Sequence, residues 1–149
     1  MSWAGVWPGI FSAAASAPAF LLAIPAGVLS DILDRRKFLI CIQLLLASVS
    51  IALMTLSALG MQTVFSLVAF TFLGGIGAAL MGPTWQAIVP ELVGKKDLKS
   101  AVALNSLGIN ISRAVGPALG GMVLAGLGAS VAYGVDVISY VFVVAALLW

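Results

Sequence analysis

Two long stretches without charge dominate this sequence. No Asp, Glu, Lys or Arg occurs before Asp31, and none occurs between Lys37 and Glu91. A helix needs about 20 apolar residues to cross the ~30 Å hydrocarbon layer of a membrane. Strands are not expected, because the apolar runs do not alternate and far exceed the ~10 residues of a barrel strand. The pattern therefore predicts a series of transmembrane helices.

The composition supports the same conclusion and excludes several functions. Hydrophobic residues make up 62% of the chain and charged residues 8%, whereas a soluble domain carries about 25% charged residues. The sequence has no His and a single Cys, Cys41, so no His-based catalysis, metal site or internal disulfide is expected. A net charge of +2 is too small to indicate nucleic-acid binding.

Five apolar stretches have the length of a membrane span. The fold class expected is an all-α integral membrane protein, a multi-helix bundle in contact with the lipid bilayer. The third helix is expected to end near Pro83 or to continue toward Pro90. The predicted spans are residues 8–30, 38–57, 63–83, 101–126 and 130–149.

The basic residues fall in alternate loops. Six of the seven lie after the first and third spans, and the other two loops are uncharged. By the positive-inside rule, the basic loops are cytoplasmic, and the start of the first span is external. The protein is therefore expected in a cell membrane, as a multi-pass protein. The six residues are Arg35, Arg36, Lys37, Lys95, Lys96 and Lys99.

Small residues recur every fourth position in the first, third and fourth spans. Such rows allow helix backbones to approach closely in lipid, so these three spans are predicted to pack inside the bundle. The second and fifth spans, which are rich in bulky residues, are predicted to face lipid. The rows are Ala15, Ala19, Ala23 and Gly27; Gly74, Ala78 and Gly82; and Gly108, Ser112, Gly116 and Gly120.

The first basic loop contains a recognisable motif, G-V-L-S-D-I-L-D-R-R-K over residues 27–37. It resembles the signature G-x-L-x-D-R-x-G-R-R/K between the second and third helices of major facilitator superfamily transporters. The resemblance implies helix packing at the glycine, and a cytoplasmic charge cluster that latches two halves together through Asp31 and Arg35. Topology alone is an alternative explanation for the basic residues. The matching positions are Gly27, Leu29, Asp31, Arg35 and Arg36, and the departures are Ile32 and Asp34.

The fourth span contains a second motif, formed by Gly116, Pro117, Gly120 and Gly121. It resembles the G-P-x-x-G-G core found in drug-export branches of the superfamily. Pro117 lacks a backbone donor and can bend the helix, and the glycines permit close packing. A packing kink without directional meaning is the alternative.

Residues 82–93, G-P-T-W-Q-A-I-V-P-E-L-V, extend the resemblance to the exporter subfamily that includes the enterobactin exporter. The spans would then be helices two to six of an N-terminal half. The first helix and the C-terminal half of the same protein would be missing partners. A bacterial cytoplasmic membrane is implied.

Two charged residues lie within spans and are candidates for substrate binding or ion coupling. Arg113 falls near mid-membrane, where a charge needs a partner or water. Asn105, Ser106 and Asn110 share its helical arc, which could line an aqueous cavity. Asp136 lies about seven residues into the last span, and its estimated depth differs from that of Arg113 by roughly 8 Å. A structural role is the alternative for both charges.

Together these features predict an exporter of small, siderophore- or drug-like molecules that works by alternating access. The resemblance implies a proton gradient as energy source and no cofactor. A small membrane scaffold or assembly protein without transport activity is the alternative. An enzyme is not expected, because the spans hold no converging set of nucleophiles, acids and bases.

Overall fold

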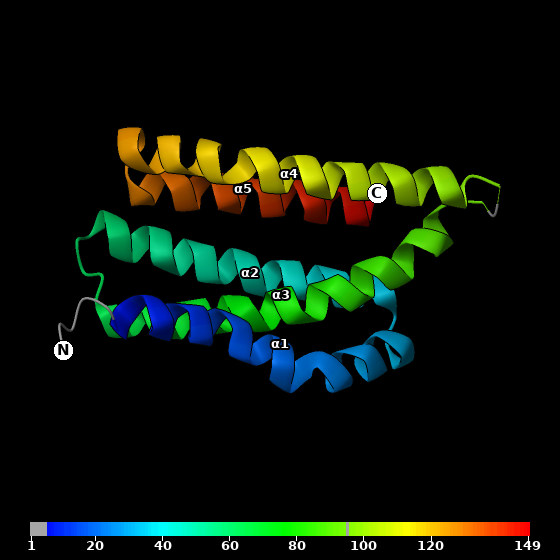
Figure 1. Cartoon of the computed structure of the whole chain (residues 1–149), viewed down its shortest axis with the longest axis horizontal. Coiled ribbons are helices and arrows are strands. Elements are labelled where there is room, and N and C mark those ends of the chain that lie inside the picture. Colours follow the sequence, from blue (N-terminus) through cyan, green and yellow to red (C-terminus); the bar gives the residue numbers. More distant parts are fainter. Residues whose placement is uncertain (1–5, 95) are drawn as a thin grey trace.

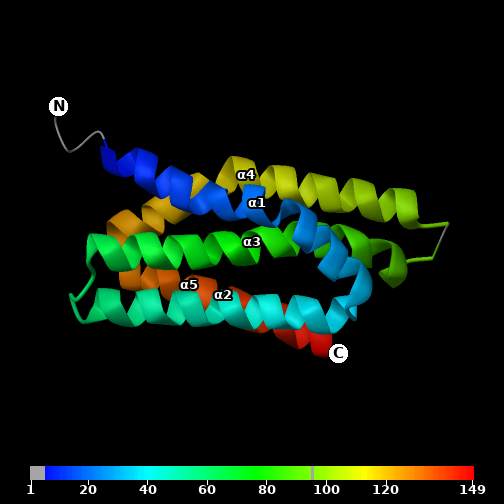
Figure 2. The same ribbon diagram turned by 90° about the horizontal axis from the view of Figure 1, so that it is seen from below.

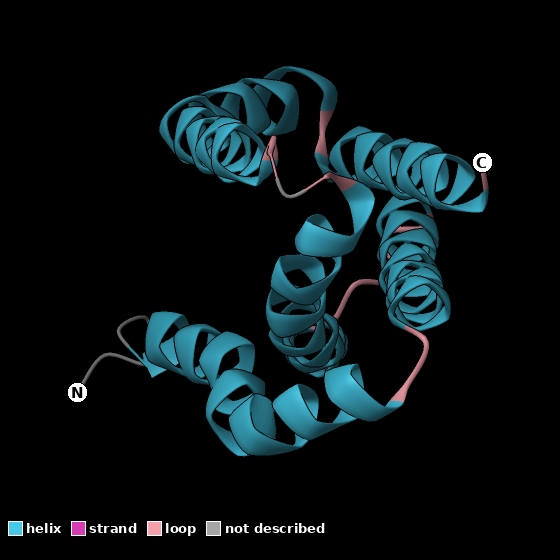
Figure 3. Cartoon of the chain, turned by 90° about the vertical axis from the view of Figure 1, so that its right-hand side faces the viewer, coloured by secondary structure: helices cyan, strands magenta, loops and turns pink. Residues whose placement is uncertain are grey.

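The computed structural model describes residues 6–94 and 96–149. This part of the chain consists of helices and connecting loops, without strands (Figure 3). Each predicted span corresponds to one helix, and the third continues through Pro83 and Pro90. The all-α prediction is confirmed. The helices are α1 Val6–Ile32, α2 Arg35–Ala58, α3 Val64–Leu92, α4 Leu98–Leu127 and α5 Ala129–Leu148.

The helices have the dimensions of membrane spans. Four of them, α2 to α5, are long and apolar enough to cross a bilayer. In α1, the described apolar stretch is shorter, Pro8–Leu22. These lengths agree with a multi-pass membrane protein that contacts lipid.

Local sequence signals set the helix ends. The Asp34 carboxylate accepts hydrogen bonds from the backbone N–H groups of Arg36 and Lys37 and so caps the start of α2. Thr63 and Ser66 form a reciprocal capping box at the start of α3. Such caps satisfy N–H groups that have no partner within the helix.

The turns after α2 and between α4 and α5 use glycine. Gly60 has φ +66° after α2, and Gly128 has φ +85° between α4 and α5. These left-handed conformations favour glycine, because it has no Cβ. They allow each pair of helices to reverse direction over a few residues.

The helix α3 contacts α1, α2 and α4 (Figures 1 and 2). It packs mainly against α1 and α2, and α2 packs in turn against α5. The helix α4 lies at the edge, against α5 and α3. Most of the buried apolar side chains come from α2, and they are Leu39, Ile42, Leu46, Val49 and Leu53, joined by Ile88 from α3.

The prediction that the second span faces lipid is wrong. The helix α2 has more buried residues than any other described helix, whereas α4, predicted to lie inside, has none. The physical reason is that branched and bulky side chains fill the space between α2, α3 and α5 by van der Waals contact. A row of small residues shows where a helix can approach, but not whether a neighbour is present.

Close helix contact occurs at Gly75 and Gly77. A Cβ added to Gly75 would lie 2.7 Å from the carbonyl oxygen of Ala15, and one added to Gly77 would lie 2.5 Å from Leu46 Cδ2. By contrast, a Cβ at Gly74 or Gly82 would meet nothing within 4 Å. The row predicted in this span is therefore displaced by one residue from the glycine that contacts α1.

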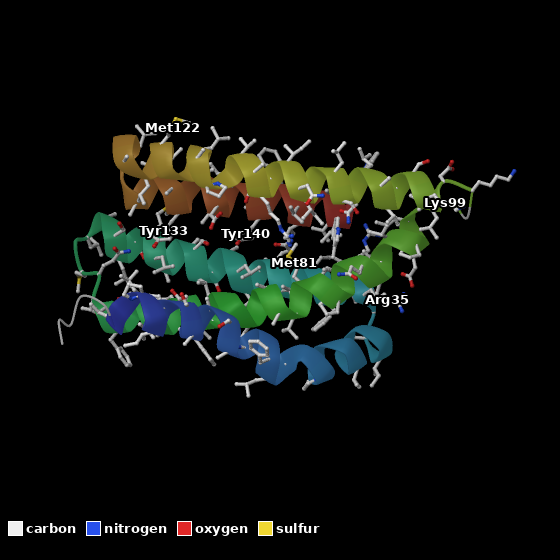
Figure 4. All side chains as sticks on the ribbon, viewed as in Figure 1. Arg35, Met81, Lys99, Met122, Tyr133 and Tyr140 are labelled. Carbon is white, nitrogen blue, oxygen red and sulfur yellow. The ribbon has the colours of Figure 1, made fainter. Side chains whose placement is uncertain are left out.

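The described basic loop residues gather at one end of the bundle. The loops between α1 and α2 and between α3 and α4 lie at the same end, where Arg35 and Lys99 are labelled (Figure 4). The opposite end carries the two uncharged turns at Gly60 and Gly128 (Figure 2). Lys95 lies outside the described residues. This asymmetry agrees with the predicted topology.

The Gly75 contact gives a stability prediction with a matched control. Gly75→Ala should lower the free energy of unfolding in detergent by about 1–3 kcal/mol, because the methyl group meets α1 backbone that cannot rotate away. Gly74→Ala in the same helix has open space and should be neutral or stabilising by up to ~1 kcal/mol. Thermal unfolding followed by circular dichroism measures both. Equal effects of the two substitutions would contradict the close approach of α1 to α3.

Candidate functional site

At the basic end of the bundle, Arg35 and Arg36 connect α2 to two other helices. The Arg35 guanidinium lies 2.6 Å from Glu91 Oε1 and donates a hydrogen bond of 3.0 Å to the carbonyl oxygen of Ala87. The Arg36 guanidinium donates to the carbonyl oxygen of Leu147 near the end of α5. The start of α2 is thus tied to the ends of α3 and α5. Because the Arg35–Glu91 pair is partly exposed, it contributes at most ~1 kcal/mol to stability.

The predicted latch is only partly described. Gly27 and Asp31 lie in α1, close to its end, but their surroundings lie outside the described part of the structure. Asp34, which departs from the family signature, caps α2. This local role explains why an acid is compatible with the position, since Asp and Gly both serve as N-cap residues.

An open crevice lies between α3 and α4. The Trp85 indole N–H donates a hydrogen bond of 3.1 Å to Asn105 Oδ1, which joins the two helices. Around this pair lies a cavity of about 490 Å³. It is lined by Trp85, Asn105, Gly108, Ile109, Ser112 and Arg113. The bundle therefore holds an open space bordered by indole, amide, hydroxyl and guanidinium groups.

Arg113 is the charged residue of this crevice. It lies 15 residues beyond Leu98, or about 22 Å along a helix of about 45 Å, which places it midway along α4. Among the described residues, Arg113 has neither an ion pair nor a hydrogen bond. A guanidinium in that position can bind a carboxylate or phosphate group through two parallel hydrogen bonds. The crevice can thus bind an anionic group between α3 and α4.

The other predicted residues of α4 lie in different surroundings. Ser106 lines a smaller neighbouring cavity with Gln86 and Pro90. Asn110 is exposed, and it does not line the crevice with Arg113. The structure thus brings Asn105 and Arg113 together, with Ser106 nearby and Asn110 apart.

The Gly-Pro motif lies further along α4, and the helix continues through Pro117. A Cβ added to Gly116, Gly120 or Gly121 would meet nothing within 4 Å in the described structure. The packing role predicted for these glycines therefore has no partner among the described helices. It stays a prediction.

Asp136 lies in a second cavity, between α2, α3 and α5. The Ser50 hydroxyl lies 3.4 Å from Asp136 Oδ2. No ion pair joins Asp136 to Arg113 in the described structure, as their separate cavities require. The two intramembrane charges therefore belong to different sites.

Three residues in these sites had no role assigned from sequence, namely Trp85, Glu91 and Ser50. Trp85 and Glu91 lie in the segment of residues 82–93 that carried the family resemblance. The signal for Trp85 was an indole within an otherwise apolar span, and the signal for Glu91 was an acid beside a basic loop. Ser50 gave no such signal, because a helical Ser usually bonds to its own backbone.

Among the described residues, no three His, Cys, Asp or Glu side chains lie together. The chemistry available in the two cavities is hydrogen bonding and charge pairing.

Known proteins that are similar to this chain are membrane transport proteins. A family model described as a transmembrane secretion effector matches residues 6–149. The staphyloferrin A transporter of Staphylococcus aureus (strain NCTC 8325 / PS 47) is 32% identical over 124 residues, which cover 80% of this chain. The chain spans 30% of the length of that relative. No solved structure matches the chain.

Proposed function

Because the chain belongs to the transmembrane secretion effector family of major facilitator superfamily transporters, we propose that it forms part of a proton-driven exporter of small molecules. The transport family favours this function over the membrane scaffold that the sequence left open. The exporter would lie in a bacterial cytoplasmic membrane, with the loops of Arg35 and Lys99 in the cytoplasm. A protein of this kind works by rocking two halves around a mid-membrane site.

The observation that carries the proposal is the crevice of Trp85, Asn105 and Arg113. The crevice extends from the Trp85–Asn105 pair to Arg113, which lies midway along α4, the depth at which an alternating-access site is reached from both sides. Arg113 supplies a fixed positive charge, and Asn105 supplies an amide already held by Trp85. A guanidinium and an amide together favour a substrate with carboxylate or similar anionic groups. The siderophore- or drug-like substrate class rests on this chemistry and on the name of the relative.

The glycines of α4 support a larger assembly. Their open surfaces suit a close helix neighbour, and the chain spans 30% of its relative. We infer that a further helix, corresponding to the first of the N-terminal half, packs along Gly116 and Gly120. A C-terminal half completes the transport path. The C-terminal partner and the Arg35–Glu91 pair would meet at the cytoplasmic end, where the charge cluster latches the halves.

Substitution of Arg113 tests the substrate site. In the full-length protein reconstituted in proteoliposomes, Arg113→Gln should lower staphyloferrin A efflux at least about tenfold, since a lost charged hydrogen bond costs ~1.5–3 kcal/mol. Arg113→Lys keeps the charge without the paired donors and should give an intermediate rate. Lys99→Gln, on the exposed loop end, is the control and should transport normally. Normal efflux by Arg113→Gln would exclude Arg113 from the substrate path.

Substitution of Gly116 tests the missing helix. In the 149-residue chain, Gly116→Leu should leave the unfolding temperature in detergent unchanged or slightly raised, because an added Cβ would meet nothing within 4 Å and Gly is a poor helix former. In the full-length protein the same substitution should lower it by several degrees, since overpacking costs about 1–3 kcal/mol. The 149-residue chain thus serves as the matched control. An unchanged unfolding temperature in both would show that the glycine row faces lipid.

A further inference from the structure

A further cavity, of about 510 Å³, lies at the basic end of the bundle, between α2, α3 and α5. Its walls are mostly apolar, with Ile88 and Leu92 from α3 and Val143 and Leu147 from α5. Arg36 is the one charged residue among the described side chains that line it. The cavity has the size of a small-molecule binding site, and it combines an apolar interior with a single cation.

The guanidinium of Arg36 is available to a ligand. Its Nε donates a hydrogen bond to the carbonyl oxygen of Leu147, which holds the side chain against α5. Among the described residues, no carboxylate pairs with Arg36, whereas the neighbouring Arg35 is paired with Glu91. The remaining N–H donors of Arg36 lie on its terminal nitrogens. Parallel donors of this kind match the oxygens of a phosphate group.

The cavity extends from the level of the lipid headgroups into the hydrocarbon layer. Arg36 lies in the first turn of α2, at the end of the bundle that the positive-inside rule assigns to the cytoplasm. Trp85 also lines the cavity and lies seven residues before Leu92, the last residue of α3, or about 10 Å along the helix. A phospholipid in the bilayer would therefore have its phosphate near Arg36 and its acyl chains near Ile88 and Trp85.

We propose that this cavity binds an anionic phospholipid of the cytoplasmic leaflet. The phosphate accepts hydrogen bonds from Arg36, and the upper part of one acyl chain lies against α3 and α5. Basic pockets between transmembrane helices on the cytoplasmic side bind anionic headgroups in this way. The apolar walls accept any acyl chain, because lipid tails and Leu side chains are equally apolar. Selectivity therefore comes from Arg36, which favours a headgroup with a net negative charge over a zwitterionic one.

Trp85 connects the lipid cavity to the crevice of Arg113. The indole ring lines both spaces, and Asn105, which lines the crevice, accepts a hydrogen bond from its N–H. A bound acyl chain therefore packs against the same ring that borders the crevice. The two spaces have separate cations, Arg36 and Arg113, so each can be altered without changing the other. The indole is also a fluorophore that reports a lipid in the cavity.

Quenching of Trp85 fluorescence by brominated lipids tests the site in the 149-residue chain. Replacing Trp3, Trp7 and Trp149 by Phe leaves Trp85 as the one tryptophan. The vesicles contain phosphatidylcholine and phosphatidylglycerol in a fixed ratio, and one of the two lipids carries bromine on its acyl chains. Bromine quenches an indole on contact, so the two series give the relative occupancy of the cavity. We expect phosphatidylglycerol to be preferred about fivefold, the effect of one basic residue near an anionic membrane surface.

Substitutions around the cavity separate specific binding from diffuse surface charge. Arg36→Gln should abolish the preference, and Arg36→Lys should retain part of it, because Lys keeps the charge without the paired donors. Ala146→Leu narrows the cavity from α5 without changing a charge, and it should also lower the preference. Lys37→Gln removes the adjacent charge, which does not line the cavity, and is the matched control with an unchanged preference.

Other outcomes would overturn the proposal. Equal quenching by the two lipids before these substitutions would exclude a selective site. A preference that survives Arg36→Gln or is unchanged by Ala146→Leu would place the lipid elsewhere, and an equal loss in Lys37→Gln would indicate diffuse attraction. Loss of the preference on adding inorganic phosphate at constant ionic strength would assign the cavity to a free anion. Its absence from the full-length protein, with Trp85 as the one tryptophan, would show that another segment fills the cavity.

Discussion

The close approach of α1 to α3 is the constraint from which the rest of the bundle follows. At Gly75 the α1 backbone lies where any Cβ would clash, and at Gly77 the Leu46 side chain of α2 lies equally close. In lipid, where apolar surface gives little driving force, such backbone proximity supplies the van der Waals contact that holds helices together. The helix α3 is therefore fixed from two sides. Its remaining surface, which includes Trp85, is left to face α4.

This arrangement places two polar cavities on neighbouring sides of α3. The crevice toward α4 has the guanidinium of Arg113 and the amide of Asn105, and the cavity toward α2 and α5 has the carboxyl of Asp136 with the Ser50 hydroxyl 3.4 Å away. Ala78 and Met81 line the cavity of Asp136 and also a smaller pocket beside the crevice, which Trp85, Asn105 and Arg113 line as well. Residues of α3 line both cavities, so the two lie within one set of helices.

The sequence predicted the elements of this fold more completely than their arrangement. Apolar stretches located every helix, because the cost of charge in lipid acts on each span alone. Neighbours depend on how side chains fit, so the glycine rows indicated Gly74 where Gly75 makes the contact, and assigned α2 to the lipid. Arg113 and Asn105 were found because polar residues in spans are rare. The roles of Ser50 and Trp85 could not be predicted, because their partners Asp136 and Asn105 lie on other helices.

We propose that these helices form part of an alternating-access transporter and need the remainder of the protein to transport. Flux in proteoliposomes driven by an imposed proton gradient tests it most directly, with the full-length protein and the 149-residue chain measured side by side. The account predicts saturable, gradient-driven flux from the full-length protein and none from the chain alone. Saturable, gradient-driven flux from the 149-residue chain would show that these helices suffice, and would contradict the account.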